Sequence, residues 1–318
     1  MNPIKVAVVG AGAFGRNHVR VLSECSGVQL AGVVDVIADR AAAAAAQFGC
    51  PAYANHADLA GKVDAAIVAV PTSAHTEVGC DLMEAGIDVL VEKPIAPDRE
   101  GAQRLIEIAE RRNRILMIGH LERFNPAVMA LKRIARHPLF FEVHRLSLFS
   151  PRSLDVDVVL DLMIHDLDIV LDLAGCAPEE IRAAGISILS KKVDIANVRL
   201  AFPTGCIANL TASRVSTERV RKLRLFQPSQ YISLDYSRQE AVAFAVQADQ
   251  KIDFQTLPVE KSEPLKIEVG HFLECVAARR VPAVSGADGL RALDVALSIL
   301  AKIEEHAQLV GRQLTSLP

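Results

Sequence analysis

The chain has 318 residues, of which 51% are hydrophobic and 23% are charged, and its formal net charge is −3. That length predicts about two domains with a sizeable buried core. The small net charge excludes a bulk attraction to nucleic acid or to an acidic membrane surface. The six cysteines include no C-x-x-C pair, so neither a zinc site nor a disulfide framework is indicated. We expect no metal and, without a basic export leader before the first apolar run, a cytoplasmic protein.

The first 25 residues predict a strand, a glycine turn and a helix. Residues 5–9 form a β-branched run, which Gly10-Ala11-Gly12-Ala13-Phe14-Gly15 and an amphipathic stretch, 16–25, follow directly. The G-x-G-x-x-G spacing allows a tight turn, a close approach of the backbone to a pyrophosphate, and close packing of the helix on the strand. Amide N–H groups at the helix start then face the anion. The motif therefore predicts a dinucleotide site.

A second apolar run, 28–34, ends in Asp35, about 20 residues beyond the last glycine of the turn. An acid at this place accepts hydrogen bonds from the adenosine ribose hydroxyls and repels a 2′-phosphate, which favours NAD over NADP. Arg40 weakens that preference slightly, because a nearby arginine can accommodate a 2′-phosphate. The structural alternative is a tight turn in which Asp35 only caps the next helix.

Strand and helix patterns continue to alternate after residue 60. We expect strands at 63–70, 87–91 and 115–118 and helices at 76–85 and 99–112. This alternation predicts a doubly wound parallel sheet, which binds ligands at the carboxyl ends of its strands. The residues predicted to contact the cofactor there are Gly10, Gly12, Ala13, Phe14, Gly15, Asp35, Arg40, Pro71, Thr72, His75, Glu92, Lys93 and His120. Thr72 and His75 could equally cap a helix and face solvent.

Lys93 is predicted to lie at the carboxyl end of a buried strand, where it can meet a ligand. It belongs to Glu92-Lys93-Pro94, where the apolar run 87–91 ends. Proline restricts the residue before it to extended conformations, so this lysine is held rigidly at a strand end. A solvated lysine is the alternative for such a tripeptide taken alone.

The pattern changes after residue 138. Strands are expected at 140–149, 181–189, 196–202, 206–213, 222–226, 231–236 and 241–246, and most have no helix between them. They predict a large, mainly antiparallel sheet. A helix at 158–173 interrupts the series, and helices at 264–278 and 289–309 close the chain. We therefore predict a Rossmann domain at 1–121 and a substrate-binding and oligomerisation domain at 122–318, whose closing helices could pack back on the first.

The inserted helix carries Asp161, His165 and Asp168. Residues three and four apart lie on one face of a helix, and a carboxylate can orient an imidazole for proton transfer near neutral pH. A lone histidine on an apolar helix could equally be a satisfied core residue. Three such groups on an apolar stripe, however, are costly to bury.

Together the motifs resemble the glucose-fructose oxidoreductase / inositol dehydrogenase (Gfo/Idh/MocA) family. The residues that carry the resemblance are the glycine turn, 71–75, Glu92-Lys93-Pro94, Asp161 with His165, and 289–294. The family implies a Rossmann domain, a second domain with an open sheet that mediates oligomerisation, and NAD(P)-dependent oxidation of sugar-like hydroxyls. It also implies that Lys93, Asp161 and His165 are catalytic. Family members often have a Gly-Gly pair just before the aspartate, where this chain has Val158-Val159-Leu160.

Two further strings, 119–126 and 159–168, resemble one subgroup, the UDP-N-acetylglucosamine 3-dehydrogenases. That subgroup supplies a 3-keto nucleotide sugar to an aminotransferase in the synthesis of diamino-glucose lipid A. Arginine suits forked contacts with a diphosphate. The predicted substrate contacts are Arg123, Asn125, Arg152, Asp161, His165 and Asp168.

Three other functions stay open from the sequence. The chain could oxidise inositol or a free sugar, act as an NADP-linked reductase of the same fold, or bind NAD as a non-enzymatic regulator. Asp35 argues against the reductase, and the presence of both Lys93 and His165 argues against the regulator. A homodimer or homotetramer is expected from the resemblance.

Overall fold

The computed structural model describes residues 3–149, 156–247 and 249–315, with side chains described up to residue 309. The chain forms two compact units. Unit 1 comprises Met1–Leu121 and Glu263–Leu290, and unit 2 comprises Glu122–Ser262 and Arg291–Pro318. Unit 1 therefore takes a segment from late in the chain. None of the described helices is both long and apolar enough to cross a bilayer.

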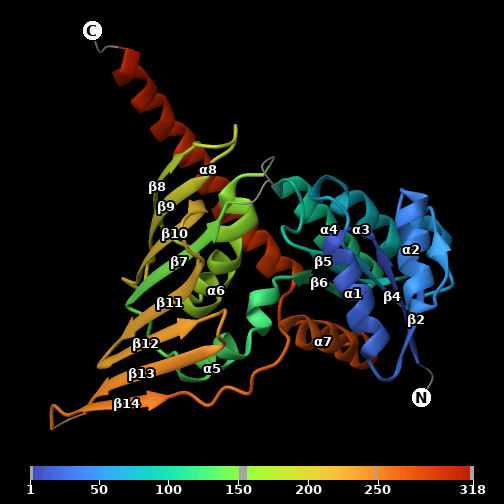
Figure 1. Ribbon diagram of the computed structural model, residues 1–318, viewed down its shortest axis with the longest axis horizontal. Coiled ribbons are helices and arrows are strands. Elements are labelled where there is room, and N and C mark those ends of the chain that lie inside the picture. Colours follow the sequence, from blue (N-terminus) through green and yellow to red (C-terminus); the bar gives the residue numbers. More distant parts are fainter. Residues whose placement is uncertain (1–2, 150–155, 248, 316–318) are drawn as a thin grey trace. The chain divides into compact units, whose positions relative to one another are not determined.

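Unit 1 contains a six-stranded parallel sheet in the order β3-β2-β1-β4-β5-β6 (Figure 1). Its strands are β1 (Ile4–Val9), β2 (Val28–Val34), β3 (Ala52–Tyr53), β4 (Ala65–Val68), β5 (Asp88–Glu92) and β6 (Leu116–Gly119). Its helices are α1 (Ala13–Glu24), α2 (Ala38–Phe48), η1 (His56–Leu59), η2 (Thr72–Ala74), α3 (His75–Glu84), α4 (Arg99–Arg112) and α7 (Pro264–Ala278). Strand order reverses beside β1, which is where doubly wound sheets bind their ligands.

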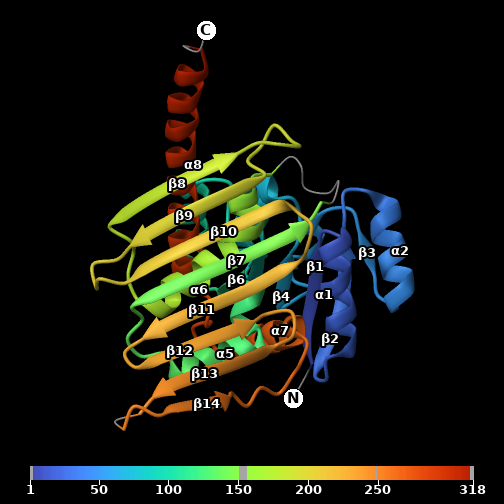
Figure 2. The same ribbon diagram turned by 60° about the vertical axis from the view of Figure 1, so that its left-hand side comes forward.

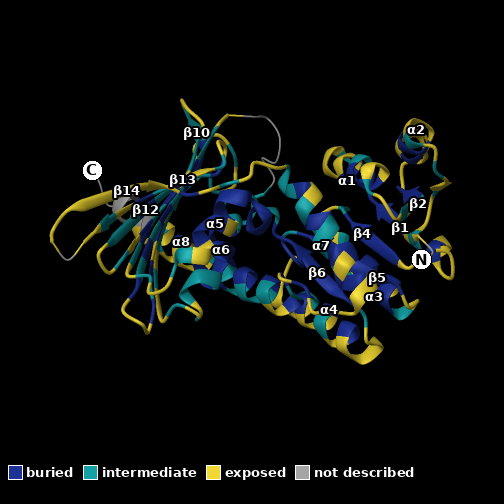
Figure 3. Ribbon diagram, turned by 90° about the horizontal axis from the view of Figure 1, so that it is seen from below, coloured by how far each residue is buried: buried dark blue, intermediate teal, exposed yellow. Residues whose placement is uncertain are grey.

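Burial explains the continuous apolar runs of these strands. All four residues of β4 and all five of β5 are buried, which is expected where helices cover both faces of a parallel sheet. Figure 3 shows α1 and α2 on one side of the strands and α3 and α4 on the other. Helix α7 packs against α1. Polar groups are therefore accommodated at the carboxyl ends of the strands.

Unit 2 contains an eight-stranded sheet in the order β14-β13-β12-β11-β7-β10-β9-β8 (Figure 2). Its strands are β7 (Phe140–Leu148), β8 (Glu180–Ile186), β9 (Ile195–Ala201), β10 (Ile207–Ser216), β11 (Val220–Gln227), β12 (Gln230–Asp235), β13 (Glu240–Val246) and β14 (Ile252–Thr256). Neighbouring strands are antiparallel except for β7 and β10, which are parallel. The sheet is thus mainly antiparallel, as predicted.

Helices cover one face of this sheet. They are η3 (Leu121–Phe124), α5 (Pro126–Ile134), η4 (Val159–Met163), α6 (Ile164–Ala174) and α8 (Gly286–Thr315). The first residues of η3 and of α8 belong to unit 1. Alternate residues of β7, such as Phe141 and Val143, are buried against this helical layer, together with Leu167 of α6 and Ala296 of α8. Among the described residues, no helix of unit 2 lies on the opposite face of the sheet (Figure 2).

The predicted fold class is confirmed, but the expected helix at 158–173 differs in detail. Its first turn, η4, is a π-helix, and the regular α6 begins at Ile164. Asp157 precedes it and accepts a hydrogen bond from the Val193 N–H at 2.9 Å, while the Val158 N–H donates to the Val193 carbonyl at 2.9 Å. The start of this helix is therefore bonded to the β8–β9 loop.

Asp194 organises that loop. It accepts hydrogen bonds from the backbone N–H groups of Ile188, Leu189 and Ser190 at 2.6–3.0 Å. Burial alone would raise the pKa of Asp194, but these donors and the Ser190 hydroxyl lower it to about 2. A carboxylate with several N–H donors stays ionised, so the loop that holds the start of η4 is firmly bonded at neutral pH.

Candidate active site

The glycine turn has the geometry that a dinucleotide requires. Gly10 has φ +101°, and a Cβ there would lie 2.5 Å from the Ala69 carbonyl oxygen. A Cβ on Gly15 would lie 1.8 Å from the Gly10 carbonyl oxygen, whereas a Cβ on Gly12 would meet nothing within 4 Å. Gly10 and Gly15 are therefore needed by the fold itself. Gly12 instead opens a space at the start of α1, where a pyrophosphate can approach the backbone.

Asp35 connects this turn to the end of β2. Its Oδ2 accepts a hydrogen bond from the Ala11 N–H at 2.8 Å, and its Oδ1 accepts one from the Ile37 N–H at 2.8 Å. A carboxylate has about four acceptor positions, so two N–H donors leave capacity for ribose hydroxyls. Ala13, Phe14 and Arg40 are exposed close by in the sequence. The predicted adenosine end of the cofactor site is thus built from unit 1 alone.

His75 braces the loops that follow β4 and β5. Its Nδ1 lies 2.8 Å from the Pro94 carbonyl oxygen and its Nε2 lies 3.0 Å from the Val70 carbonyl oxygen. Burial lowers the pKa of His75, whereas the two carbonyl oxygens oppose this shift, because only a protonated ring can donate to both of them. With the ring enclosed by these two carbonyls, His75 supports the cofactor loops from inside. Pro71 and Thr72, in contrast, are at least partly exposed.

Lys93 follows β5 and is half-buried, and its peptide bond to Pro94 is cis. The preceding residue, Glu92, is buried at the strand end. Its Oε1 lies 2.7 Å from His18 Nε2, and its Oε2 accepts a hydrogen bond from the Lys93 N–H at 3.3 Å. A Cβ on Gly119 would lie 3.0 Å from the same carboxylate. Glu92 therefore serves to fix the segment from which Lys93 projects, and His120 is buried directly after Gly119.

Asp161 and His165 belong to unit 2, on either side of the junction between η4 and α6. Both side chains are half-buried. A π turn inside a helix commonly marks a functional position, because it re-aims the side chains around it. The pair thus occupies a helix segment whose geometry departs from the regular α-helix assumed from the spacing.

A buried arginine fixes the residue that follows His165. Arg145 of β7 is 1% exposed and donates from Nε and Nη2 to the two carboxylate oxygens of Asp166, at 2.6 and 2.9 Å. Its Nη1 donates to Glu122 Oε1 at 3.0 Å, and its guanidinium lies over the Tyr236 ring. The two carboxylates raise the pKa of Arg145 although its burial would lower it. The sequence analysis did not identify Asp166 as a residue that positions His165, because its partner, Arg145, lies on a strand that is distant in the sequence.

Arg123 and Asp168 were predicted to bind the substrate, but they bind each other. Arg123 Nε and Nη2 donate to Asp168 at 2.7 and 2.8 Å, and Nη1 lies 2.9 Å from Asp172. Arg123 is 8% exposed and Asp168 is 1% exposed. Because both charges are satisfied inside the protein, the geometry argues against a direct contact of either residue with the substrate.

Asn125 is committed in the same way. Its Oδ1 accepts a hydrogen bond from the Ala127 N–H at 3.1 Å and so caps α5. Its Nδ2 donates to Glu122 and to the Tyr236 carbonyl oxygen, each at 3.1 Å. Arg152, the other predicted diphosphate ligand, lies outside the described residues. Asp161 and His165 are the two predicted substrate contacts that lie at the junction of η4 and α6.

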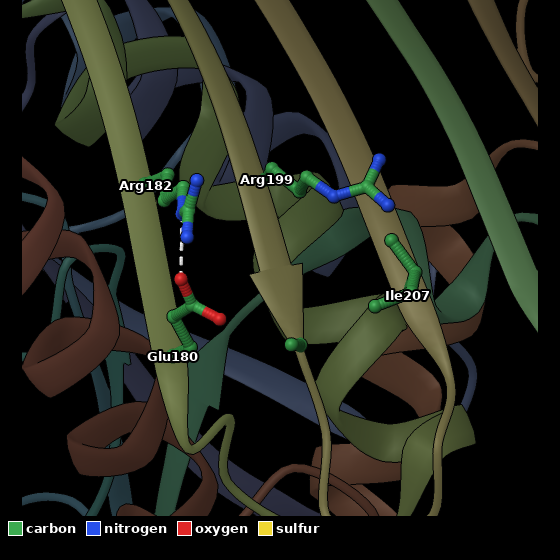
Figure 4. A pocket seen from close by; sticks show the side chains of 5 residues that line it. Glu180, Arg182, Arg199 and Ile207 are labelled. Atoms are coloured by element: carbon green, nitrogen blue, oxygen red, sulfur yellow. Dashed lines mark hydrogen bonds and ion pairs between the residues drawn. The ribbon is translucent and has the colours of Figure 1, made fainter.

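Two surface hollows lie away from all of these residues. One, of about 290 Å³, is on the open face of the unit 2 sheet and is lined by Glu180, Arg182, Arg199, Ala201 and Ile207 (Figure 4). Arg182 pairs there with Glu180, and Arg199 donates to Asn209. The other, of about 340 Å³, is in unit 1 beside the end of α4 and the start of α8. Neither is lined by a predicted site residue, so neither is the candidate active site.

Comparison with known proteins agrees with this geometry. A profile described as "Oxidoreductase family, NAD-binding Rossmann fold" matches residues 4–120, and the GFO/IDH/MocA C-terminal domain matches residues 142–227. The UDP-N-acetylglucosamine 3-dehydrogenase of Acidithiobacillus ferrooxidans is 37% identical over 311 residues, which are 96% of this chain and 99% of that protein. The chain belongs to the GFO/IDH/MocA family. It is therefore an oxidoreductase with an NAD-binding Rossmann domain.

Other GFO/IDH/MocA relatives include inositol 2-dehydrogenases. That of Corynebacterium glutamicum strain R is 31% identical over 183 residues, 54% of each chain. Among solved structures, the Acidithiobacillus ferrooxidans enzyme superposes with a TM-score of 0.91 at 37% identity and covers 96% of this chain and 99% of its own. The fold is thus shared along nearly the whole chain with an enzyme named as a UDP-N-acetylglucosamine 3-dehydrogenase.

The residues present fit the cofactor of the GFO/IDH/MocA family. The space beside Gly12 admits a pyrophosphate, and Asp35 keeps acceptor capacity next to it. Thr72, Glu92 and Lys93 follow the neighbouring strands β4 and β5 on the same rim of the sheet. Each of these residues lies in unit 1, which therefore supplies the described groups that would hold NAD.

Gly12→Ala and Gly15→Ala should separate binding from folding. Gly15→Ala should lower the free energy of unfolding by about 1–3 kcal/mol or more, because its Cβ meets a backbone carbonyl. Gly12→Ala should leave unfolding nearly unchanged but weaken NAD binding by about tenfold or more, on the order of 1.4 kcal/mol. Thermal unfolding and NAD titration of both variants check this. A stable Gly15→Ala protein would contradict the role assigned to that glycine.

Proposed function

We propose that the chain is an NAD-dependent dehydrogenase that oxidises the 3-hydroxyl of UDP-N-acetylglucosamine to the 3-keto nucleotide sugar, as a step toward a lipid A precursor. The observation that supports this substrate is the 37% identity, over 96% of this chain, to an enzyme named as a UDP-N-acetylglucosamine 3-dehydrogenase. The glycine turn, Asp35, Lys93 and His165 supply the required groups. We propose that the enzyme acts in the cytoplasm, where its product would pass to a sugar aminotransferase.

The proposed chemistry assigns each polar group one task. Bound NAD supplies the acceptor for a hydride from the sugar carbon. His165, oriented by Asp161, takes the proton of the same hydroxyl group, and Lys93 donates a hydrogen bond to its oxygen. A base and a donor on one oxygen favour the developing carbonyl.

The diphosphate of the substrate needs cationic donors or backbone amides. Of the two arginines predicted to contact the substrate, Arg123 pairs with the buried carboxylate of Asp168, so Arg152 stays as the proposed ligand. Arg152 precedes the helix of His165 in the chain.

A second candidate substrate is inositol or a free sugar. Inositol 2-dehydrogenases are 31% identical over about half of this chain, and the same base and donor would serve their hydroxyl. A nucleotide sugar is favoured because the nucleotide-sugar enzyme is similar over nearly the full length, including unit 2.

A substrate comparison tests this proposal. Purified enzyme with NAD should form NADH with UDP-N-acetylglucosamine, most clearly when an aminotransferase and glutamate remove the 3-keto product. UDP-glucose, free N-acetylglucosamine and inositol should react more slowly. Absorbance of reduced nicotinamide measures each rate. Faster turnover of inositol or of the free sugar would reject the nucleotide-sugar proposal and leave the family assignment standing.

Lys93→Ala and His165→Ala should each lower kcat by about 10²–10⁴-fold, because each removes a group that acts on the reacting hydroxyl. Single-turnover kinetics and NAD titration measure chemistry and binding separately. Lys62→Ala and His56→Ala are matched controls, since these side chains contact Tyr53 and Asp81 on the surface of unit 1. Near-normal turnover in either of the first two variants, with NAD still bound, would refute the assigned roles.

We also propose that the open face of the unit 2 sheet joins copies of this chain. Aromatic rings cross five strands there in sequence, from Phe140 through Phe226, Tyr231 and Phe244 to Phe254, with centroids 4.9–5.7 Å apart. Phe254 is 57% exposed. Continuous exposed apolar surface of this kind marks a protein interface, and a second copy offers the same surface to it.

The double variant Phe244→Ser/Phe254→Ser should shift the assembly toward monomers, because it removes apolar area from both partners at once. Sedimentation velocity across a concentration series measures this shift. Val281→Ser is the control, since Val281 is 83% exposed and belongs to unit 1. A double variant that sediments like the parent protein would place the interface elsewhere.

A further inference from the structure

A buried cluster in unit 1 contains two carboxylates and one imidazole. His18 comes from α1, Glu92 from the end of β5, and Glu268 from α7. One ligand atom from each lies within 4.8 Å of the other two. His18 and Glu268 are fully buried and Glu92 is 8% exposed. Nothing in the catalytic scheme uses Glu268, and a carboxylate is not buried without an energetic cost.

Glu92 and Glu268 differ in their hydrogen bonds. Glu92 accepts at both oxygens, from His18 Nε2 at 2.7 Å and from the Lys93 N–H at 3.3 Å. Glu268 has both oxygens buried without a hydrogen-bond partner among the described residues, and Nδ1 of His18 is in the same condition. Glu92 is therefore placed as a charged acceptor. Glu268 is placed where a negative charge would have no donor.

A proton on Glu268 resolves this arrangement. Burial raises the pKa of Glu268 well above its usual range, and the nearby Glu92 carboxylate raises it further. A protonated carboxyl group is neutral and presents an O–H, and the Glu92 carboxylate, with an oxygen within 4.8 Å of Glu268, is the nearby acceptor. Two negative charges at this distance would instead repel each other and pull Glu92 from its bonds.

A divalent cation is the competing occupant, because two carboxylates and an imidazole can ligate one. A cation shared by Glu92 and His18 would need the Nε2 lone pair, which would replace the 2.7 Å hydrogen bond between them. The observed bond therefore favours a proton over a metal.

We propose that Glu268 is held as a neutral carboxylic acid and is a positioning residue for Lys93, acting through Glu92. The neutral acid leaves Glu92 as the one negative charge of the cluster, so that Glu92 keeps its bonds to His18 and to the Lys93 backbone. Glu268 thereby fixes the end of β5 without touching substrate or cofactor. The catalytic part of this inference rests on the proposed role of Lys93, whereas the protonation of Glu268 does not.

The first test is independent of activity. A buried acid with a raised pKa binds its proton more tightly in the folded state, so its contribution to stability is full below the unfolded pKa and is lost as pH rises toward the folded pKa. Glu268→Gln lacks this loss. Its unfolding temperature relative to the parent protein should therefore increase steadily from about pH 5 to pH 8.

Other titrating groups do not obscure this comparison. On the facing elements these are His18 on α1, Glu92 and Lys93 at the end of β5, and the ion pairs Arg20–Glu263 and Glu24–Lys266 between α1 and the start of α7. His271 lies on α7 itself. All of them are retained in Glu268→Gln, and Glu274→Gln, an exposed change on the same helix, is the matched control that should show no trend.

Infrared spectroscopy gives a direct reading. The parent protein at pH 8 should show the carbonyl band of a protonated carboxyl group, and Glu268→Gln should lose it. Metal analysis of the purified protein should find no bound divalent cation that Glu268→Gln lacks. A missing carboxyl band, or one metal ion per chain that disappears in the variant, would overturn the proposal.

Kinetics test the positioning role with whichever substrate the parent protein oxidises. Glu268→Gln keeps the size and neutrality of the acid, so its kcat and the pH profile of kcat/KM should match the parent. Glu268→Leu should lower kcat by about tenfold to a hundredfold with little change in the KM for NAD. Equal kcat in both variants would overturn the positioning role. If Glu268→Leu fails to fold, an altered pH profile of kcat/KM in Glu268→Gln would still overturn the positioning role of Glu268.

The two proposals fail in different ways. If UDP-N-acetylglucosamine is not a substrate, the parent protein shows no turnover with it while the infrared band and the stability trend are unchanged. If Glu268 is ionised, the band and the trend are absent while the parent protein still oxidises its substrate.

Discussion

The ion pair between Arg145 and Asp166 is the interaction on which the proposed catalytic helix of unit 2 depends. It joins the middle strand of the sheet to the helix of His165 at the residue next to that histidine. Removing one partner of such a buried pair leaves the other uncompensated, which typically costs about 3–5 kcal/mol. Arg123 holds Asp168 two residues further on. His165 is thus placed by charges on its neighbours.

In unit 1 the predicted site residues are positioned by backbone geometry and by short polar contacts. The glycine turn leaves space at one strand end, Asp35 ties that turn to the next strand, and His75 holds the two following loops together. These contacts use side chains, such as Asp35 and His75, that the sequence analysis predicted to bind the cofactor. Much of the polarity at the rim of the sheet therefore supports the loops, while fewer groups remain to contact the cofactor.

The sequence predicted features whose signal is local. The G-x-G-x-x-G turn, Asp35 and Glu92-Lys93-Pro94 are short motifs with fixed spacing, and the alternating apolar runs predicted the parallel sheet. Pairing between distant residues carries no such signal, so Arg123 and Asp168 were assigned to the substrate although they bind each other. Glu268 was not singled out, because a glutamate within an expected helix gives no sign in the sequence that it is buried. Strand β14 was missed although its sequence, Ile-Asp-Phe-Gln-Thr, alternates apolar and polar residues, and all five of these residues are exposed.

The composition of unit 1 from two separate stretches of chain has a consequence for synthesis of the protein. His18 and Glu92 are made early, but Glu268, which completes their cluster, is on α7 near the end of the chain. Because chains emerge from the ribosome in order, the sheet of unit 1 must wait, with this edge of α1 uncovered, until nearly the whole of unit 2 has been translated. A fragment ending at residue 121 would lack the helix that closes its own core.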